Sequence, residues 1–283
     1  MTYKELLSKG ENVLKQCDVP DYSIDAYIFM EIVFGMSRAV YYIKCNDTIE
    51  DEALIEQYLD MIEKRSKRIP LQHITNSQEF MGLSFYVDEN VLCPRQDTEC
   101  LVEEALKAID DNVDVLDMCT GSGCIAISIK KLCDKVNHMT AVDLSEEALR
   151  IAKKNADTHN TDVEFVHSNL FENLKDRKYD IIISNPPYIR TSDIDELMDE
   201  VKIHEPMMAL DGYEDGLYFY REITSKAKGY LRVGGWLMYE IGYDQGEEVK
   251  AIMINNGFDD IEIIKDLAGL DRIVKGRIIG GKQ

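Results

Sequence analysis

The sequence of 283 residues lacks most of the features that mark secreted, membrane-spanning or zinc-stabilised proteins. It has seven cysteines but no Cys-x-x-Cys pair, so we expect neither a paired disulfide framework nor a bound metal. No apolar run approaches the roughly 18 residues that a membrane helix needs. The N-terminus has no signal-peptide pattern. These absences predict a reduced, cytoplasmic protein without a membrane segment.

Basic residues are scarce as well: 32 Lys and Arg stand against 53 Asp and Glu, which gives a formal net charge of −21. Broad binding to a phosphate backbone depends on clustered Lys and Arg, so the composition argues against direct nucleic-acid binding. The hydrophobic content of 45 % is high enough for a folded core despite the charge. Residues 193–215 form the densest acidic stretch, with nine acids and one base, Lys202. Such a run is usually a solvated surface, but this one follows the most informative motif in the chain.

The patterning divides the chain into three parts. Residues 1–70 show apolar residues at helical spacing and no strand-like alternation, with Gly35 predicted to end one helix and Pro70 to end the last. Residues 71–93 are rich in aromatic and β-branched residues around a glycine, which predicts a β-hairpin linker. From residue 94 to residue 283, strands alternate with helices, which is typical of a doubly wound parallel sheet.

Seven strands are predicted in this last part. The final two, near residues 261–264 and 272–279, are separated by a link too short for a parallel crossover, so one of them is expected to run antiparallel. The predicted fold class is therefore α/β, with a mostly parallel, doubly wound sheet that follows a small all-α domain and a hairpin.

A glycine-rich turn follows the first strand of the sheet. Residues 119–123 read Cys-Thr-Gly-Ser-Gly and open into a helix, so the backbone can approach a ligand closely beside a helix N-terminus. Asp143 closes the next strand, where a carboxylate can accept hydrogen bonds from both hydroxyls of an adenosine ribose.

Two cofactors fit this loop. It satisfies G-x-G-x-x-A, the dinucleotide fingerprint, so an NAD-dependent oxidoreductase is one interpretation. Asp117 favours S-adenosylmethionine instead, because its carboxylate can face the amino group of a methionine moiety and would sit badly beside a pyrophosphate. A tight turn that binds no ligand is the third interpretation.

Asn185-Pro186-Pro187-Tyr188 stands at the C-terminal end of the fourth predicted strand, the edge at which open α/β sheets bind ligands. The prolines remove two backbone donors, so the turn presents the Asn185 side chain and the Pro186 carbonyl as acceptors, and Tyr188 can lie over a flat amide. An amide or arylamine nitrogen is a weak nucleophile, and acceptors that hold both of its N–H bonds turn its lone pair toward a methyl donor. The motif therefore indicates methyl transfer to an amino group.

In order along the chain, these motifs resemble the protein-(glutamine-N5) methyltransferases that modify class 1 peptide-chain release factors, the PrmC/HemK family. The resemblance covers most of the chain. Besides the glycine loop and Asn-Pro-Pro-Tyr it includes residues 70–74 and 79–83, Pro94-Arg95-Gln96-Asp97-Thr98-Glu99, Glu205-Pro206, residues 215–217, Tyr220-Arg221, residues 234–235, Glu240-Ile241-Gly242 and Asp271-Arg272. Two positions depart from the family pattern: Cys119 replaces the usual Gly, and Asn169 replaces the usual Asp.

The resemblance implies a release-factor docking domain over residues 1–70, a linker over 71–93 and a class I methyltransferase domain over 94–283. It implies methyl transfer from S-adenosylmethionine, which becomes S-adenosylhomocysteine, to the glutamine of the Gly-Gly-Gln motif in the factor. We expect the protein to act as a monomer. By position, the cofactor would contact Asp117, Cys119, Thr120, Gly121, Ser122, Gly123, Asp143, Asn169, Leu170 and Asn185.

In the same way, Asn185, Pro186, Pro187 and Tyr188 would hold the glutamine, with Asn185, Pro186 and Tyr188 as the catalytic set. Leu170 would lie near the adenine, whose amino group Asn169 could still bind. An adenine-N6 methyltransferase acting on DNA or RNA is the alternative, because such enzymes share Asn-Pro-Pro-Tyr. The acidic stretch at 193–215 would repel phosphates and favours a basic protein loop as substrate.

Overall fold

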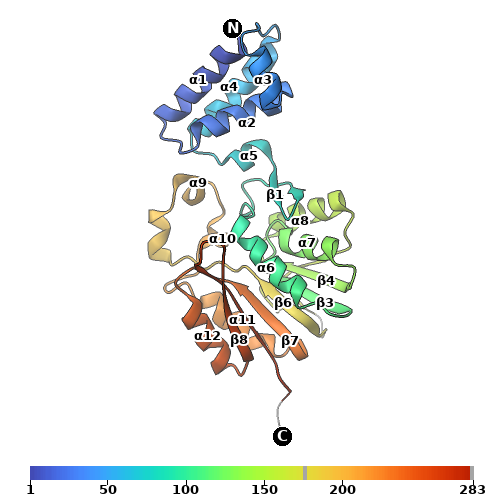
Figure 1. Cartoon of the computed structure of the whole chain (residues 1–283). Helices are drawn as coiled ribbons and strands as arrows, with labels where there is room; N and C mark the ends of the chain where they lie inside the picture. The colour runs from blue at the N-terminus through green and yellow to red at the C-terminus, as the bar shows by residue number, and fades with distance from the viewer. Residues whose placement is uncertain (175–176, 281–283) are drawn as a thin grey trace. The chain divides into compact units, whose positions relative to one another are not determined.

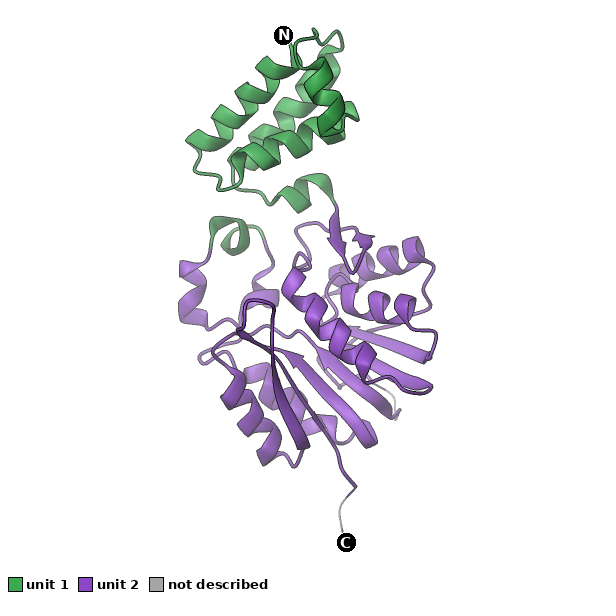
Figure 2. Cartoon of the chain, viewed as in Figure 1, with its two compact units in different colours: residues 1–76, 198–204 green, residues 77–197, 205–283 purple. Residues whose placement is uncertain are grey.

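The computed structural model describes residues 1–174 and 177–280, and the chain divides into two compact units. Unit 1 comprises residues 1–76 together with 198–204, and unit 2 comprises 77–197 and the residues from 205 onward (Figure 2). The boundary expected at residue 70 differs from this division, because a further short helix follows Pro70 and its apolar side chains pack against the core of unit 1. Residues 281–283, the end of the predicted third part, lie outside the described residues.

Unit 1 is built from helices, as predicted for its first 70 residues. Thr2 begins the first helix with a capping box, in which its hydroxyl accepts from the Glu5 amide and the Glu5 carboxylate accepts from the Thr2 amide. Gly35 ends the second helix with φ of 62°, the left-handed conformation that the sequence predicted. The helices are α1 (Tyr3–Gln16), α2 (Tyr22–Phe34), α3 (Arg38–Lys44), α4 (Glu52–Ser66), α5 (Leu71–Thr75) and the short α9 (Asp199–Lys202).

The core of unit 1 lies where α1, α2 and α4 meet. Leu6 and Leu14 of α1, Phe29 of α2 and Tyr58 of α4 are fully buried there. Gly10 permits the close approach of α1 to α4, because a Cβ at this position would stand 2.2 Å from the Tyr58 hydroxyl oxygen. The sequence of unit 1 thus specifies a helical core of its own.

Charged side chains hold the segment 198–204 within unit 1. The Glu200 carboxylate accepts hydrogen bonds from Arg68 Nε at 2.8 Å and from Arg65 Nη1 at 3.0 Å. Arg65 also donates to Asp25 at 2.7 Å, and both side chains of that pair are only 7 % exposed. This buried network joins α2 and α4 to a segment that is far away in the sequence.

Unit 2 begins with the predicted hairpin. Strands β1 (Gln78–Phe80) and β2 (Leu83–Phe85) pair antiparallel, with Phe80 opposite Leu83. The two-residue turn between them has φ of 51° at Met81 and 71° at Gly82, so both central residues are left-handed, as in the turns that fit the twist of a hairpin.

A seven-stranded sheet forms the body of unit 2 (Figure 1). Its strand order is β5-β4-β3-β6-β7-β9-β8. Neighbouring strands from β5 to β7 pair in parallel, while β9 is antiparallel to both β7 and β8, which confirms the predicted antiparallel strand. The strands are β3 (Val113–Met118), β4 (Val136–Asp143), β5 (Glu164–His167), β6 (Tyr179–Ser184), β7 (Leu231–Glu240), β8 (Asp259–Lys265) and β9 (Asp271–Arg277).

Helices cover both faces of this sheet. Ile181 and Ile183 of β6 belong to a core with α6 and α7, whereas Ile182 between them belongs to a core with α11 and α12. This alternation is the period-2 pattern of a strand buried on both faces. The helical elements of unit 2 are α6 (Gln96–Lys107), α7 (Cys124–Leu132), α8 (Glu146–His159), the 3-10 helix η1 (Thr191–Glu196), α10 (Met207–Leu210), α11 (Tyr218–Ala227) and α12 (Gly246–Asn255).

Among the residues that the structure describes, no single helix is long and apolar enough to cross a membrane. Helices α2 and α3 reach that length and composition only when taken together, and they are bent by 83° relative to each other.

Candidate active site

A pocket of about 470 Å³ opens at the carboxyl ends of the central parallel strands β3, β4 and β6. This is the edge at which ligands bind in open α/β sheets. Its walls come from residues that follow these strands, together with α6 and the loop before it. They include Arg95, Thr98, Cys119, Thr120, Gly121, Ser122, Asp143, Ser168, Asn169, Leu170, Asn185 and Pro187. The structure therefore gathers most of the predicted site residues around one cavity.

The glycine loop after β3 forms one wall of the pocket. Gly121 has φ of 54°, and a Cβ there would meet nothing within 4 Å, so its backbone is open to a ligand. Gly123 has φ of 81°, and a Cβ there would stand 2.9 Å from Ile127 Cδ1, so this glycine allows close packing of the loop. Among the described residues it does not line the cavity. Cys119 adopts φ of 63°, a conformation that glycine favours, which explains why the family pattern has Gly at this position.

Buried hydrogen bonds to Asp117 hold the same loop in place. Asp117 is fully buried at the end of β3, and its Oδ2 accepts from the Thr120 hydroxyl at 2.6 Å and from the Ala126 amide at 3.2 Å. Burial raises the pKa of this carboxyl to about 7. Asp117 is absent from the pocket walls formed by the described residues, so its predicted contact with a methionine amino group stays a prediction.

Asp143 ends β4 and lines the pocket, as its predicted role requires. Its Oδ2 accepts from the Gly121 amide at 2.8 Å, and its Oδ1 accepts from the Ser145 amide at 2.9 Å. These bonds fix the carboxylate beside the glycine loop, and each oxygen retains a second lone pair. Burial nevertheless raises the pKa of Asp143 above its usual value.

Asn169 and Leu170, which follow β5, also line the pocket. Leu170 has φ of 50° and is 8 % exposed, so it contributes an apolar surface. Asn169 donates from Nδ2 to Glu172 at 2.9 Å. This bond leaves the Asn169 carbonyl oxygen as the group that can accept from an adenine amino group, and that role stays a prediction.

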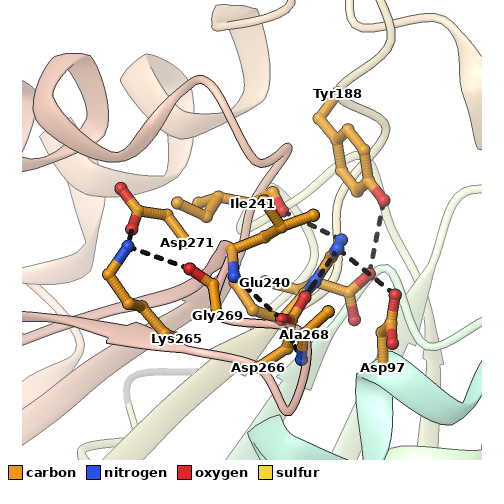
Figure 3. Close-up of polar contacts among 11 residues, drawn as sticks. Asp97, Tyr188, Glu240, Ile241, Lys265, Asp266, Ala268, Gly269 and Asp271 are labelled. Carbon is orange, nitrogen blue, oxygen red and sulfur yellow. Dashed lines mark hydrogen bonds and ion pairs between the residues drawn. The ribbon is translucent and has the colours of Figure 1, made fainter.

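The Asn-Pro-Pro-Tyr turn divides between the pocket and the protein interior. Asn185 and Pro187 line the cavity, whereas Pro186 and Tyr188 do not within the described parts of the chain. Tyr188 turns its hydroxyl toward Glu240 and donates to that carboxylate at 3.4 Å (Figure 3). The stacking of the Tyr188 ring over a substrate amide stays a prediction.

Backbone contacts fix the course of the chain after this turn. The Tyr188 carbonyl accepts from Gln245 Nε2 at 3.0 Å, and a Cβ at Gly216 would stand 2.4 Å from the same oxygen. The Ile189 carbonyl accepts from the Gly212 amide at 2.8 Å. The turn is thus held against α12 and the loop before α11, which keeps Asn185 at the pocket wall.

Residues without an assigned role in the sequence reasoning line the pocket or lie near the residues that do. Thr98 of α6 is buried, lines the pocket and accepts from Asn185 Nδ2 at 3.4 Å. Glu240, at the end of β7, is 2 % exposed, and burial raises its pKa to about 7. Arg272 donates to the carbonyl of Ile241 at 3.5 Å and pairs with Asp97 at 3.2 Å. Their segments carry the family resemblance, but nothing in their spacing indicated that Glu240 meets Tyr188 or that Arg272 pairs with Asp97.

Part of the acidic stretch that follows the motif is paired with arginines of the same chain. Asp215 pairs with Arg221 at 2.8 Å, and Glu205 pairs with Arg95 at 2.7 Å. Within unit 1, Glu200 pairs with two arginines, as described above. Less of this charge is therefore available to a basic substrate loop than the sequence suggests.

Comparisons with known proteins found two family models that match separate parts of the chain. The family described as Methyltransferase small domain matches residues 95–211, and the family described as PrmC N-terminal domain matches residues 5–75. A protein of Clostridium acetobutylicum named release factor glutamine methyltransferase is 43 % identical over 280 residues, which cover 97 % of this chain and 98 % of the relative.

A relative of the same name from Geobacter sulfurreducens is 39 % identical over 277 residues and covers 98 % of this chain and 97 % of its own length. Among solved structures, a methyltransferase from Pyrococcus furiosus is similar with a TM-score of 0.56 and 16 % identity, over 77 % of this chain and 99 % of that one. At that identity the likeness shows the shared fold alone.

Proposed function

The chain belongs to the family of release factor glutamine methyltransferases, and from this premise we propose that it methylates the side-chain amide nitrogen of a glutamine in class 1 peptide-chain release factors. The observation that carries the proposal is the position of Asn185. It stands at the end of β6 in the wall of the same pocket as the glycine loop and Asp143. A methyl donor and an amide can therefore meet in one cavity. The target glutamine is that of the Gly-Gly-Gln motif.

We further propose S-adenosylmethionine as the methyl donor, because the residues of the pocket fit that molecule. The open Gly121 backbone offers space for the methionine part, the Asp143 carboxylate offers acceptors for ribose hydroxyls, and Leu170 offers an apolar surface to the adenine. The volume of about 470 Å³ lies within the range of small-molecule sites. When bound, this cofactor supplies a methyl group on a sulfonium, which makes it electrophilic.

Within this scheme the chain acts by positioning. Asn185 Oδ1 accepts one N–H of the glutamine amide, and the Pro186 carbonyl is proposed as the second acceptor. With both N–H bonds held in the plane, the nitrogen lone pair would turn toward the sulfonium methyl group that the bound cofactor would supply, and S-adenosylhomocysteine would be the other product. The extra proton on the methylated nitrogen would then pass to water. Orientation of this kind can lower the activation free energy by several kcal/mol, which raises the rate on the order of 10³-fold or more.

We propose that unit 1 docks the release factor and that the protein acts as a monomer in the cytoplasm. Several apolar side chains on its surface support a protein-binding role: Tyr42 is 73 % exposed and Ile43 is 81 % exposed, both on α3. Isolated exposed apolar residues are common, but two adjacent ones on a short helix offer a contact of the kind that protein interfaces use.

The experiment is mass spectrometry of a class 1 release factor incubated with the protein and S-adenosylmethionine. We expect a gain of one methyl group on the tryptic peptide that contains Gly-Gly-Gln, and no gain on a factor in which that glutamine is replaced by asparagine. The Asn185→Ala variant should lose turnover by roughly 10³-fold or more while its cofactor affinity, measured by calorimetry, stays within about threefold. Methyl transfer to DNA or RNA without transfer to the factor would overturn the proposal and favour an adenine-N6 enzyme.

A further inference from the structure

The Asn-Pro-Pro-Tyr turn depends on bonds at its two ends, because its two prolines have no backbone N–H to donate. At the first end, Ser184 is the last residue of β6, and its hydroxyl donates to the Met118 carbonyl at 2.6 Å. At the second end, the Tyr188 carbonyl accepts from Gln245 Nε2 at 3.0 Å. The position of Asn185 between these two ends therefore depends on both bonds.

The side-chain amide of Gln245 lies where three backbone segments meet. The residue is 3 % exposed, and its Nε2 donates to the Gly216 carbonyl at 3.3 Å as well as to Tyr188. Its Oε1 accepts from the Gly242 amide at 3.0 Å. A flipped amide would place Oε1 against two carbonyl oxygens, which is strongly unfavourable in a buried site. These partners therefore fix the orientation of the Gln245 amide.

Glycines let the backbone approach this amide closely. A Cβ at Gly216 would stand 2.6 Å from Gln245 Nε2, and a Cβ at Gly242 would stand 2.9 Å from Gln245 Oε1. A Cβ at Gly212 would stand 2.7 Å from Tyr188 Cα. The segments around the amide are thus packed so closely that the turn has little room to shift while these bonds are in place.

The loop that carries Gly216 also contributes to the walls of the pocket. Asp211 and Tyr213 line the same cavity as Asn185, whereas Gln245 does not line it among the described residues. One buried amide outside the cavity therefore ties together the turn and the loop that form two parts of its wall.

We infer that Gln245 is a positioning residue that holds Asn185 in place by fixing the Tyr188 carbonyl. The inference rests on the proposed function, in which Asn185 Oδ1 and the Pro186 carbonyl hold the amide of a glutamine. The prolines fix two φ angles and make the turn stiff, so a displacement at Tyr188 is passed on to both acceptors. A misplacement of about 1 Å caused far from the chemistry can lower a rate on the order of 100-fold.

Gln245→Met tests the inference by kinetics, because methionine keeps the length of the side chain and removes both donors. We expect kcat for the release factor to fall on the order of 10- to 100-fold. KM for the factor and the affinity for S-adenosylmethionine should stay within about threefold, because residue 245 does not line the described pocket walls. Asn256→Ala is the control. It removes a side-chain amide bond of 2.8 Å to the Ile252 carbonyl at the other end of α12, and it should leave kcat unchanged.

Gly216→Ala reaches the same contact from the loop. The new Cβ would collide with the Tyr188 carbonyl and the Gln245 amide, so kcat should fall as it does in Gln245→Met. Gly234→Ala is the matched control, since Gly216 and Gly234 have φ of 72° and 88° but a Cβ at Gly234 would meet nothing within 4 Å. Both changes strain the backbone, and only Gly216→Ala should lower kcat.

A double variant and a spectrum without turnover separate positioning from a general loss of structure. Gln245→Met should lower kcat less in the Asn185→Ala background than in the wild type, because one of the groups that it positions is already gone. The side-chain amide resonances of Asn185 can be assigned in 15N spectra by comparison with Asn185→Ala. They should shift in Gln245→Met and Gly216→Ala and stay in place in Asn256→Ala and Gly234→Ala.

Three results would overturn the inference: normal kcat in Gln245→Met, equal losses from Gln245→Met with and without the Asn185 side chain, or Asn185 resonances that Gln245→Met leaves unchanged. A wild-type protein that does not methylate the factor would instead refute the proposed function. The comparison of resonances would still decide whether Gln245 positions Asn185, since it requires no substrate.

Discussion

Glu200 offers the sharpest test of how unit 1 is held together. Its side chain is 12 % exposed and accepts from Arg68 Nε at 2.8 Å, from Arg68 Nη2 at 2.5 Å and from Arg65 Nη1 at 3.0 Å. Glu200→Gln keeps the shape of the side chain but removes its charge. One of its two oxygens also becomes a donor that faces a guanidinium.

The expected loss follows from what the two arginines retain. Arg65 keeps its bond to Asp25 at 2.7 Å, and Arg68 keeps a bond to the Asp18 carbonyl at 3.0 Å. Neither guanidinium is therefore fully unpaired, so the loss should be smaller than the 3–5 kcal/mol typical of a completely broken buried pair. We expect about 2–3 kcal/mol in the free energy of unfolding of unit 1.

The assay uses the position of the single tryptophan. Trp236 lies on β7 in unit 2, so its fluorescence reports on unit 2, whereas far-ultraviolet circular dichroism reports on the helices of both units. In a urea titration, Glu200→Gln should move the circular-dichroism transition of unit 1 to lower urea and leave the fluorescence midpoint in place. Glu63→Gln is the matched control, because Glu63 pairs with Lys67 at the surface, where the two side chains are 67 % and 63 % exposed. This pair should contribute less than about 1 kcal/mol to the free energy of unfolding.

The pH dependence provides an internal check. The arginines hold the pKa of Glu200 below its usual value, so its stabilising effect is present above the unfolded pKa and is lost as pH falls through the folded one. The difference between wild type and Glu200→Gln should therefore shrink below about pH 4. An unchanged circular-dichroism transition at neutral pH would refute the view that Glu200 anchors the segment 198–204 in unit 1.

Three further predictions concern unit 2. Asp143→Ala should weaken binding of S-adenosylmethionine by at least tenfold in calorimetry, because it removes the carboxylate proposed for the ribose; unchanged affinity would exclude that role. Gly123→Ala should lower the free energy of unfolding by about 2–3 kcal/mol, and Gly121→Ala should lower it by about 1 kcal/mol. Both glycines have positive φ, but only at Gly123 would the new Cβ be crowded, at 2.9 Å from Ile127 Cδ1. Equal losses in chemical denaturation would refute the packing argument. Burial raises the pKa of Glu240 to about 7, so the protonated carboxyl stabilises the folded state fully below the unfolded pKa of about 4.5. The free energy of unfolding should therefore decline by about 3 kcal/mol as pH rises from there through 7. This decline should be smaller in Glu240→Gln, and identical pH profiles of the unfolding free energy would contradict the prediction.

Local patterns were sufficient for much of the fold. Gly35 and Gly82 marked a helix end and a hairpin turn, and both have the positive φ that these conformations require. The alternation of strands and helices predicted the parallel sheet, and the short link before β9 predicted that one of the last two strands is antiparallel. These features depend on neighbours in the sequence, so they are visible without the tertiary structure.

The candidate site was predictable where its residues follow strand ends. Asp143 and Asn185 end or follow adjacent parallel strands, so topology alone brings them to one edge. The direction of Tyr188 was not predictable, because it depends on Glu240, which stands 52 residues later in the chain. The bonds that Asp117 Oδ2 accepts from Thr120 and Ala126 were likewise not predicted, and its contact with a methionine amino group stays a prediction.

By itself, the sequence determined the order of the elements, the glycine loop, the Asn-Pro-Pro-Tyr turn and the shortage of basic residues that argues against a phosphate-binding surface. These are encoded by short spacings, for which backbone geometry leaves few alternatives. Only the tertiary structure decided that the Tyr188 hydroxyl meets Glu240, and that Glu200 joins unit 1. Such contacts depend on burial, which raises the energy of every unpaired charge and so selects partners that lie far apart along the chain.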